Sequence, residues 1–274
     1  MKMVADPNVL LIHLGGLGDA CISESTFHSL RRSFGNNITA VGNKRILNIF
    51  SAYFHHVESI DSRKWSYLFS ESLDGPAWPI IVFIGKDSTG SLRQLMQRIT
   101  ENFIFISMYP DSGSIQAEDY QLGQLSEWGI EPSKLEISIN YGYQIVLYPE
   151  QVYKKSRWPL SCFLRVHERL KEKGLESVML KQKNLTIPGK TIPVPDSLHD
   201  IGQLFSSGGL FVSNDSGMAH YAARSGLQTV TIFCDTNPDI WRPKNSVVFK
   251  SKNHDLIIDE VVETTISLAN RHFQ

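Results

Sequence analysis

The feature of this 274-residue sequence that most constrains its fold is an alternation of short apolar runs with amphipathic segments. Val9–Leu14 is predicted to be a strand buried on both faces. Residues 20–34 are predicted to form a helix with one apolar face, made by Ile22, Thr26, Leu30 and Phe34. The pattern then predicts strands at 38–41, 57–60, 80–84 and 103–106, with helices at 44–53 and 91–101. Such alternation predicts an α/β fold with a mostly parallel sheet covered by helices.

The alternation stops once, in a polar segment at residues 131–140 that contains Pro132, and then restarts. Strands are predicted at 143–148, 177–180, 210–213 and 229–233, and helices at 160–174, 216–225 and 256–272. The first of these helices has an apolar stripe of Leu160, Phe163, Leu164, His167 and Leu170; the last has one of Ile258, Val261, Val262, Thr265, Ile266 and Ala269. We therefore expect two Rossmann-like domains, residues 1–135 and 141–274.

The composition excludes several classes of protein. A net charge of −1 gives no bulk attraction to nucleic acid. No apolar run approaches the roughly 20 residues of a membrane helix, and residues 1–8 do not resemble a signal peptide, so a cytoplasmic protein is expected. Cys21, Cys162 and Cys234 are odd in number and far apart, which argues against a disulfide framework or a metal site and favours buried free thiols.

Charge is divided unevenly along the chain. The first 140 residues carry 11 basic and 15 acidic side chains, whereas the remaining residues carry 16 and 13. A small excess of positive charge in the second half favours that half as the site for an anionic ligand.

A glycine-rich turn follows the first predicted strand. It consists of Gly15, Gly16, Leu17, Gly18 and Asp19. Glycines permit a tight turn and a close approach of ligand to backbone, and the aspartate would lie near the start of the next helix. The aspartate either only caps this helix or also takes part in chemistry. A dinucleotide fingerprint would need a third glycine where Cys21 stands, which argues against a dehydrogenase.

A second candidate site follows the strand predicted at 210–213. Its sequence is Asn214, Asp215, Ser216, Gly217, Met218, Ala219 and His220. Asp215 is the expected N-cap, and Gly217 would expose the free N–H groups of the first helical turn, which attract anions. The alternative is a capped core helix with a buried histidine. The position of the whole segment at the carboxyl end of a strand favours a ligand site.

A basic segment follows the first strand of the second half. Between Pro149 and Pro159 it contains Lys154, Lys155, Arg157 and Trp158. Its basic side chains are suited to binding a phosphate at the carboxyl end of a strand. A solvated basic loop is the alternative.

Together these segments resemble family 9 glycosyltransferases, the ADP-heptose:lipopolysaccharide heptosyltransferases and their relatives. The Gly-Asp turn ending at Asp19 resembles theirs, and residues 155–160 resemble their Lys-Arg-Trp-Pro-Leu segment. Residues 214–220 resemble their Asp-Ser-Gly-x-x-His block, which continues through Ala222, Ala223, Gly226, Thr229 and Phe233. A later stretch with Asn237, Pro238, Trp241 and Pro243 resembles the segment that follows that block in the family.

The resemblance implies a GT-B fold, in which two Rossmann-like domains face a central cleft and the last helix returns towards the first domain. It implies an inverting, metal-independent transfer of a heptose-like sugar from a nucleotide-diphosphate donor, with ADP favoured and no cofactor. Asp19 would be the catalytic base, and Gly15, Gly16 and Gly18 the acceptor-side turn. The donor phosphates would contact Lys155, Arg157, Asp215, Ser216, Gly217, Met218 and His220. The acceptor, a glycan, a lipid-linked molecule or another hydroxyl compound, is not identified, and peripheral contact with the inner face of the membrane is compatible with the family.

The sequence departs from the family at the nucleoside end of the predicted pocket. Ser156 stands where the family has its phosphate-binding lysine, and Lys181, Gln182, Lys183 and Asn184 stand where a ribose-holding glutamate is usual. Cys234 and Asp235 replace the Gly-Pro of a Phe-Gly-Pro-Thr segment. Two alternatives therefore remain: a GT-B hydrolase or epimerase acting on a nucleotide sugar, and a non-catalytic subunit that binds one.

Overall fold

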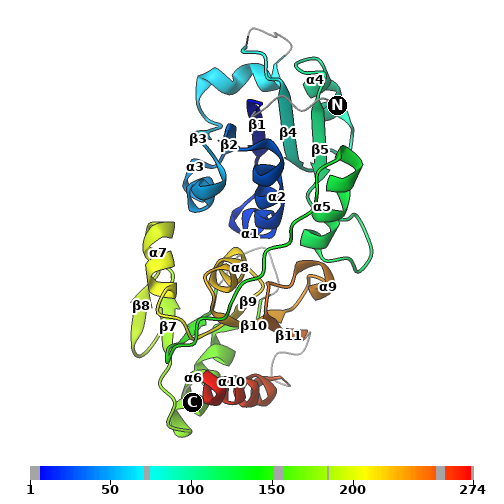
Figure 1. The fold of residues 1–274 in the computed structure, drawn as a ribbon. Helices are drawn as coiled ribbons and strands as arrows, with labels where there is room; N and C mark the ends of the chain where they lie inside the picture. Colours follow the sequence, from blue (N-terminus) through cyan, green and yellow to red (C-terminus); the bar gives the residue numbers. More distant parts are fainter. Residues whose placement is uncertain (1–6, 71–74, 151–156, 184, 251–256, 273–274) are drawn as a thin grey trace. The chain divides into compact units, whose positions relative to one another are not determined.

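The computed structural model describes residues 7–70, 75–150, 157–183, 185–250 and 257–272, and the chain divides into two compact units. The first unit is Met1–Leu135 and the second is Glu136–Gln274 (Figure 1). Each unit contains its own sheet, and all strand pairs in both sheets are parallel. The predicted α/β fold with two separate parallel sheets is confirmed.

The first unit is built on a five-stranded sheet of order β3-β2-β1-β4-β5. Its strands are β1 (Val9–His13), β2 (Ile38–Gly42), β3 (His56–Ser59), β4 (Ile80–Gly85) and β5 (Phe103–Ser107). Its α-helices are α1 (Leu17–Ile22), α2 (Glu24–Phe34), α3 (Lys44–Leu47), α4 (Ser91–Gln97) and α5 (Ala117–Leu125), with 3-10 helices at Asn48–Tyr53, Arg63–Phe69 and Ser126–Trp128. The central strands β1 and β4 are buried along their whole length, which explains their uninterrupted apolar sequences.

The second unit repeats this plan with six strands in the order β11-β10-β9-β6-β7-β8. The strands are β6 (Ile145–Tyr148), β7 (Val178–Lys181), β8 (Thr191–Pro193), β9 (Leu210–Asn214), β10 (Gln228–Phe233) and β11 (Ser246–Lys250). The helices are α6 (Leu160–Glu172), α7 (Leu198–Phe205), α8 (Gly217–Arg224), α9 (Pro238–Trp241) and α10 (Ile258–His272).

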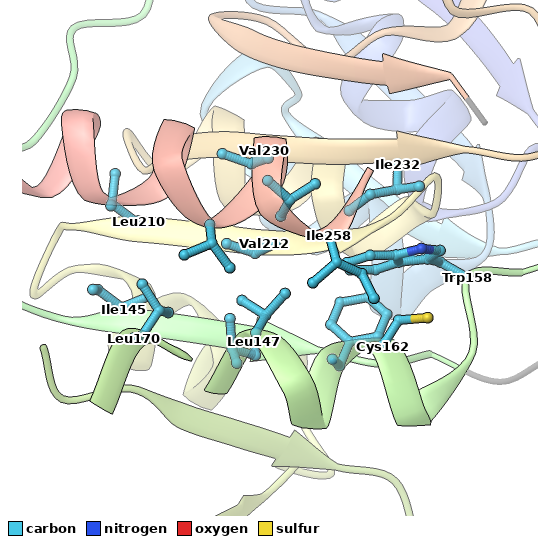
Figure 2. Close-up of a cluster of buried hydrophobic side chains, with 14 of the residues drawn as sticks. Ile145, Leu147, Trp158, Cys162, Leu170, Leu210, Val212, Val230, Ile232 and Ile258 are labelled. Carbon is cyan, nitrogen blue, oxygen red and sulfur yellow. The ribbon is translucent and has the colours of Figure 1, made fainter. Parts of the chain in front are cut away.

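The core of the second unit shows how the sequence pattern becomes packing. Helices α6 and α10 pack against each other over β6, β9 and β10 (Figure 2). Their apolar stripes face this core, where Phe163, Leu170, Ile258 and Val261 are buried. Trp158, just before α6, is fully buried and meets Phe163 edge-on with ring centroids 5.0 Å apart. Each buried side chain of this size contributes roughly 1.5–3 kcal/mol by leaving water. The packing therefore fixes Trp158 at the position just before α6.

Several predicted elements have other limits in the structure. The helix predicted at 20–34 starts earlier and is broken at Ser23 into α1 and α2, although its predicted apolar face is buried. The helix predicted at 44–53 becomes a 3-10 helix after Leu47. On α6, His167 is only half-buried, where its ring contacts Ser177 at 2.7 Å, and Cys162 and Val166 occupy the core instead. Elements that were not predicted include α5, β8, α7, α9 and β11.

All three cysteines are buried, and in the described part of the chain none forms a disulfide bond, as expected. Among the described residues, none forms a helix long and apolar enough to cross a membrane. Helix α10 packs against α6 within the second unit, and its predicted return to the first domain stays a prediction.

Candidate functional site

Both sheets reverse their strand order beside their first strand. In the first unit the reversal lies between β1 and β4, and in the second unit between β6 and β9. Parallel α/β sheets bind ligands in the crevice at the carboxyl ends of such strands, because the connecting segments diverge there to opposite faces. The segments that follow β1, β6 and β9 contain every candidate residue predicted from the sequence.

After β1, the glycine turn leads directly into α1. Asp19 is the third residue of this helix, and its Oδ2 accepts a hydrogen bond of 2.8 Å from the backbone N–H of Gly16, the N-cap residue. The turn is tight, because a Cβ on Gly15 would lie 2.6 Å from the Cβ of Asp19. Capping is thus an observed role of Asp19. The carboxylate lies just beyond the carboxyl end of β1.

His13, the last residue of β1, lies beneath this turn and was not predicted from the sequence to be functional. Its side chain is fully buried, and its Nε2 lies 3.3 Å from Ser23 Oγ. Burial lowers the pKa of His13 from its ordinary 6.5 to about 4, although weaker interactions with the backbone of His13 and Asp19 act in the opposite direction. The imidazole is therefore neutral at pH 7.

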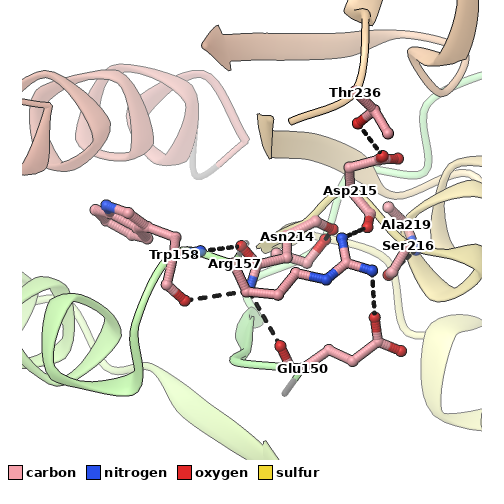
Figure 3. Close-up of polar contacts among 9 residues, drawn as sticks. Glu150, Arg157, Trp158, Asn214, Asp215, Ser216, Ala219 and Thr236 are labelled. Carbon is pink, nitrogen blue, oxygen red and sulfur yellow. Dashed lines mark hydrogen bonds and ion pairs between the residues drawn. The ribbon is translucent and has the colours of Figure 1, made fainter. Parts of the chain in front are cut away.

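In the second unit, β9 continues through Asn214, and α8 begins at Gly217. The N-cap residue is Ser216, whose hydroxyl accepts a 3.3 Å hydrogen bond from the N–H of Ala219. The prediction that Asp215 caps α8 is therefore wrong. The Asp215 carboxylate instead accepts a 2.5 Å hydrogen bond from the Thr236 hydroxyl (Figure 3). The first N–H groups of α8 follow directly on the carboxyl end of β9, as expected for an anion site.

Arg157 lies against this helix start. Its guanidinium donates a hydrogen bond to the backbone carbonyl of Asp215, and its Nη2 lies 3.5 Å from Oε2 of Glu150 (Figure 3). Only 10% of the side chain is exposed, and in the described part of the chain its Nε has no hydrogen-bond partner. A buried cation with an unused donor favours an anionic ligand. Lys154 and Lys155 lie outside the described residues.

Asn214 joins the two segments that form this arrangement. Its Oδ1 accepts a 2.8 Å hydrogen bond from the N–H of Trp158, and its Nδ2 donates to the backbone carbonyls of Glu150 and Trp158 at 3.2 and 3.3 Å (Figure 3). The buried amide thus satisfies three backbone groups on both sides of Arg157. Because Trp158 is fixed in the core, Arg157 is held in place against β9.

Met218 and His220 are buried within α8, at 7% and 8% exposure. Ser216, the N-cap residue, is equally buried at 8%, and Gly217, the first residue of the helix, is half-buried. All predicted donor residues that the structure describes come together around β6 and β9. The acceptor-side residues Gly15, Gly16, Gly18 and Asp19 belong to the other unit.

Three further polar residues at this edge were not predicted. Glu150 follows β6, Tyr148 ends it, and Gln182 follows β7. The Tyr148 hydroxyl interacts with both Glu150 and Gln182, and burial, followed by the charge of Glu150, raises the pKa of Tyr148 above its usual range. The signal that would have identified Glu150 is its position two residues beyond the strand at the switch point.

The second unit also has an open groove of about 620 Å³, far from these residues along the sheet. It lies at the amino ends of β6 and β7, opposite to the carboxyl ends that carry the candidate site. Its lining residues are Tyr143, Gln144, Ile145, Glu176, Val178, Lys190, Gln203, Leu204 and Ser207. None of them was predicted to be functional, and the carboxyl edge is the better candidate on chemical grounds.

Comparison with known proteins assigns a family to the part of the chain that contains the carboxyl ends of β6 and β9. The family model of glycosyltransferase family 9 (heptosyltransferase) matches residues 115–256, just over half of the chain, and includes Arg157 and the whole of α8. The chain belongs to glycosyltransferase family 9. It is therefore a glycosyltransferase with a heptosyltransferase-like domain. The matched region does not reach the glycine turn.

Solved structures of family 9 members have the same fold as this chain. The glycosyltransferase of Veillonella parvula has a TM-score of 0.71 at 15% identity, covering 99% of this chain and 98% of its own. The E. coli heptosyltransferase WaaC with ADP has a TM-score of 0.70 at 14% identity, covering 95% and 99%. E. coli ADP-heptose lps heptosyltransferase II has the same TM-score and identity, covering 97% and 100%. These similarities confirm the GT-B fold class. No curated protein sequence matches the chain.

Proposed function

We propose that this family 9 member transfers a heptose-like sugar from a nucleotide-diphosphate donor to an acceptor hydroxyl, with inversion and without a metal. The observation that carries the proposal is the start of α8 behind β9, with Arg157 buried against it, inside the region that matches the family. Helix N–H groups and a guanidinium together stabilise the negative charge of a leaving diphosphate. The absence of an Asp-x-Asp pair from the sequence is consistent with a metal-independent transfer.

ADP is the proposed nucleotide of the donor. One similar structure is described as an E. coli heptosyltransferase with ADP, and another as an ADP-heptose heptosyltransferase. At 14% identity these proteins support the choice without deciding it. Calorimetric titration with ADP and UDP tests it, and equal or tighter binding of UDP would contradict the choice.

In the proposed reaction the acceptor oxygen attacks the anomeric carbon of the donor sugar. The new C–O bond forms on one face while the bond to the diphosphate oxygen breaks on the other, which inverts the configuration. Asp19 takes the proton of the acceptor hydroxyl, and the nucleoside diphosphate leaves with the bonding electrons. General-base assistance of this kind contributes about 10²–10⁴-fold to the rate. Arg157 and the N–H groups of α8 stabilise the leaving group.

The acceptor is proposed to be a hydroxyl of a glycan or lipid-linked glycan, and the proposed location is the cytoplasm or the inner face of the membrane. The E. coli relative is described as a lipopolysaccharide enzyme, which supports a lipopolysaccharide-type acceptor here. A panel of acceptors incubated with ADP-heptose identifies it.

The decisive experiment is Asp19→Asn, assayed for transfer. Asparagine keeps the shape of the side chain and an oxygen that can accept from Gly16 N–H, but it cannot take a proton at neutral pH. We expect turnover to fall by ~10²-fold or more, with ADP affinity unchanged. Full transferase activity in this variant would contradict the role of Asp19. Release of free sugar by the wild-type protein would favour a hydrolase, and binding without any turnover a non-catalytic subunit.

A further inference from the structure

The second unit has a groove that the proposed reaction does not use. This open groove of about 620 Å³ lies where β6, β7 and β8 begin and where α7 ends. The strands are parallel, so the groove lies at the edge of the sheet opposite to Arg157 and the start of α8. The four residues of β6 separate the two edges by roughly 13 Å. The groove is therefore distinct from the donor site, and its volume is that of a small-molecule site.

One side of the groove is an aromatic ring on a firmly held backbone. The Tyr143 side chain is 78% exposed, although β6 begins only two residues later and is fully buried. The carbonyl of Gln144 accepts a 2.8 Å hydrogen bond from the N–H of Leu210. On the other side of Tyr143, Gly142 is buried, and a Cβ there would lie 2.3 Å from the carbonyl oxygen of Ser207. A ligand that packs on the Tyr143 ring therefore does not have to order this backbone first.

Polar side chains line the groove around this ring. The Ser207 hydroxyl donates a 3.0 Å hydrogen bond to Oε1 of Gln144, which orients the amide. Glu176 lies just before β7 and Lys190 just before β8, and both side chains are exposed. Within the described residues, neither of these two charged groups takes part in an ion pair. The groove thus offers hydrogen-bond donors and acceptors beside an aromatic face.

The charges of the lining indicate which kind of ligand it suits. One carboxylate, Glu176, and one ammonium group, Lys190, give the lining no net charge, so a phosphate or a nucleotide has no electrostatic advantage here. A purely apolar ligand would cover both charges without giving either a partner, which is costly. The C–H groups of a sugar ring pack on an aromatic face, and its hydroxyl groups donate to a carboxylate and accept from ammonium and amide groups. The lining therefore favours an uncharged ligand that is rich in hydroxyl groups.

We propose that this groove is a second, non-catalytic site that binds an uncharged segment of a glycan. Tyr143 is the surface on which a sugar ring packs, and Gln144, Glu176 and Lys190 bind its hydroxyl groups. The inference goes beyond the proposed function, because binding at this edge requires neither the donor nucleotide nor the transfer step. The site binds a glycan independently of the reaction at the opposite edge of the sheet.

The test begins with an array of uncharged bacterial oligosaccharides, and the one bound most tightly is titrated by calorimetry in the presence of excess ADP. Tyr143→Ala should weaken glycan binding by about tenfold or more, because it removes the ring on which the sugar packs. Tyr143→Phe keeps the ring and should bind nearly as well as the wild type. Tyr141→Ala is the matched control, since this tyrosine is 65% exposed but does not line the groove, and it should bind the glycan normally.

Variants of the two charged residues test the chemistry of the ligand. Glu176→Ala and Lys190→Ala should each weaken glycan binding several-fold, because each removes a partner of the hydroxyl groups. Binding should change little between low and high salt, since the ligand is uncharged. The ADP affinity of these variants should equal that of the wild type, because neither residue lies at the carboxyl edge. The substituted side chains are exposed, so the variants are expected to fold, which thermal unfolding checks.

Several results would overturn the inference. They are no binding to any oligosaccharide, full glycan binding by Tyr143→Ala, and equal weakening by Tyr141→Ala and Tyr143→Ala. A loss of binding that occurs only in Lys190→Ala, and only at low salt, would indicate an anion site and contradict a glycan site. Failure of the wild-type protein to bind ADP would contradict the proposed donor site, and the glycan titration would still decide the role of the groove.

Discussion

Each unit of this chain starts a helix after a strand that borders its switch point, and the two helix starts have opposite chemistry. In the first unit, the first turn of α1, after β1, contains an acidic residue, Asp19, whose carboxylate accepts a hydrogen bond from the N–H of the N-cap residue, Gly16. In the second unit, α8 begins after β9 with a neutral cap, Ser216, and a guanidinium, Arg157, beside it. One helix start is thus occupied by its own anion, and the other is the proposed site for an anion from outside.

The difference shows that a helix N-terminus is not by itself a binding site. Its partial positive charge attracts any nearby anion, including a side chain of the same helix. At α1 this attraction is satisfied by Asp19, which keeps a carboxylate at the carboxyl end of β1. At α8 the cap is a hydroxyl, so the attraction is available to a diphosphate. The neighbouring side chains therefore determine the chemistry of each switch point.

The largest expected effect is a decrease in the free energy of unfolding at acidic pH, caused by His13 in the first unit. His13 has a pKa of about 4 in the folded chain and 6.5 when unfolded, so the unfolded chain binds more protons between these values. Its stabilising contribution is complete above pH 6.5 and is lost as the pH falls towards 4. Between pH 7.5 and pH 4.5 the loss should be roughly 2–3 kcal/mol. Urea unfolding at the two pH values measures it.

His13→Asn is the control for this prediction, because it removes the titrating group. The variant should be less stable at pH 7.5 but should lose less on acidification than the wild type does. An identical loss in both proteins would show that His13 is not the group responsible.

Next in size is the contribution of Arg157 to donor binding. Arg157→Ala removes the cation at α8 and leaves Glu150 without its ion-pair partner, so ADP affinity should fall at least tenfold, or about 1.4 kcal/mol. Arg165→Ala, at an exposed position of α6, is the matched control and should bind ADP normally. Equal ADP affinity in the two variants would show that Arg157 does not contribute to donor binding, and would contradict the proposed electrostatic difference between the two helix starts.

The smallest effect concerns the two caps. Ser216→Ala removes the hydroxyl that accepts from Ala219 N–H and should cost ~1 kcal/mol of stability. Asp19→Asn keeps an oxygen for Gly16 N–H and should cost only a few tenths of a kcal/mol. Thermal unfolding of both variants measures these costs. A larger loss in Asp19→Asn than in Ser216→Ala would mean that the acidic cap is mainly structural.

The sequence predicted the strands with continuous apolar runs, such as β1, β4 and β10, because burial on both faces requires them. It did not predict α5, whose buried residues include Glu118 and Gln121, hydrogen-bonded to Ser25 and Thr26 of α2. A helix that buries polar side chains shows no apolar stripe. The edge strands β8 and β11 were missed because they are short or only half-buried.

At the candidate site, the sequence predicted which segments matter but not how their side chains pair. Asp215 and Ser216 are both favourable caps, and the choice between them depends on where β9 ends. The position of Glu150 just beyond β6 could have marked it as a candidate, but its contacts with Arg157 and Tyr148 could not be predicted. Such pairings depend on three-dimensional geometry that sequence spacing does not contain.

The central claim, that the donor diphosphate binds at α8 and not at the glycine turn, is tested most directly by one pair of variants. Gly217→Val places a branched side chain at the start of α8, and Gly16→Val does the same before α1. Gly16 has extended backbone that valine can adopt, and a Cβ there would approach only Asp19 Oδ2, at 3.7 Å. ADP affinity, measured by calorimetry on folded protein, should fall about tenfold or more in Gly217→Val, the loss of at least one charge-assisted hydrogen bond, and stay unchanged in Gly16→Val. Unchanged ADP affinity in Gly217→Val, or a loss confined to Gly16→Val, would contradict the account.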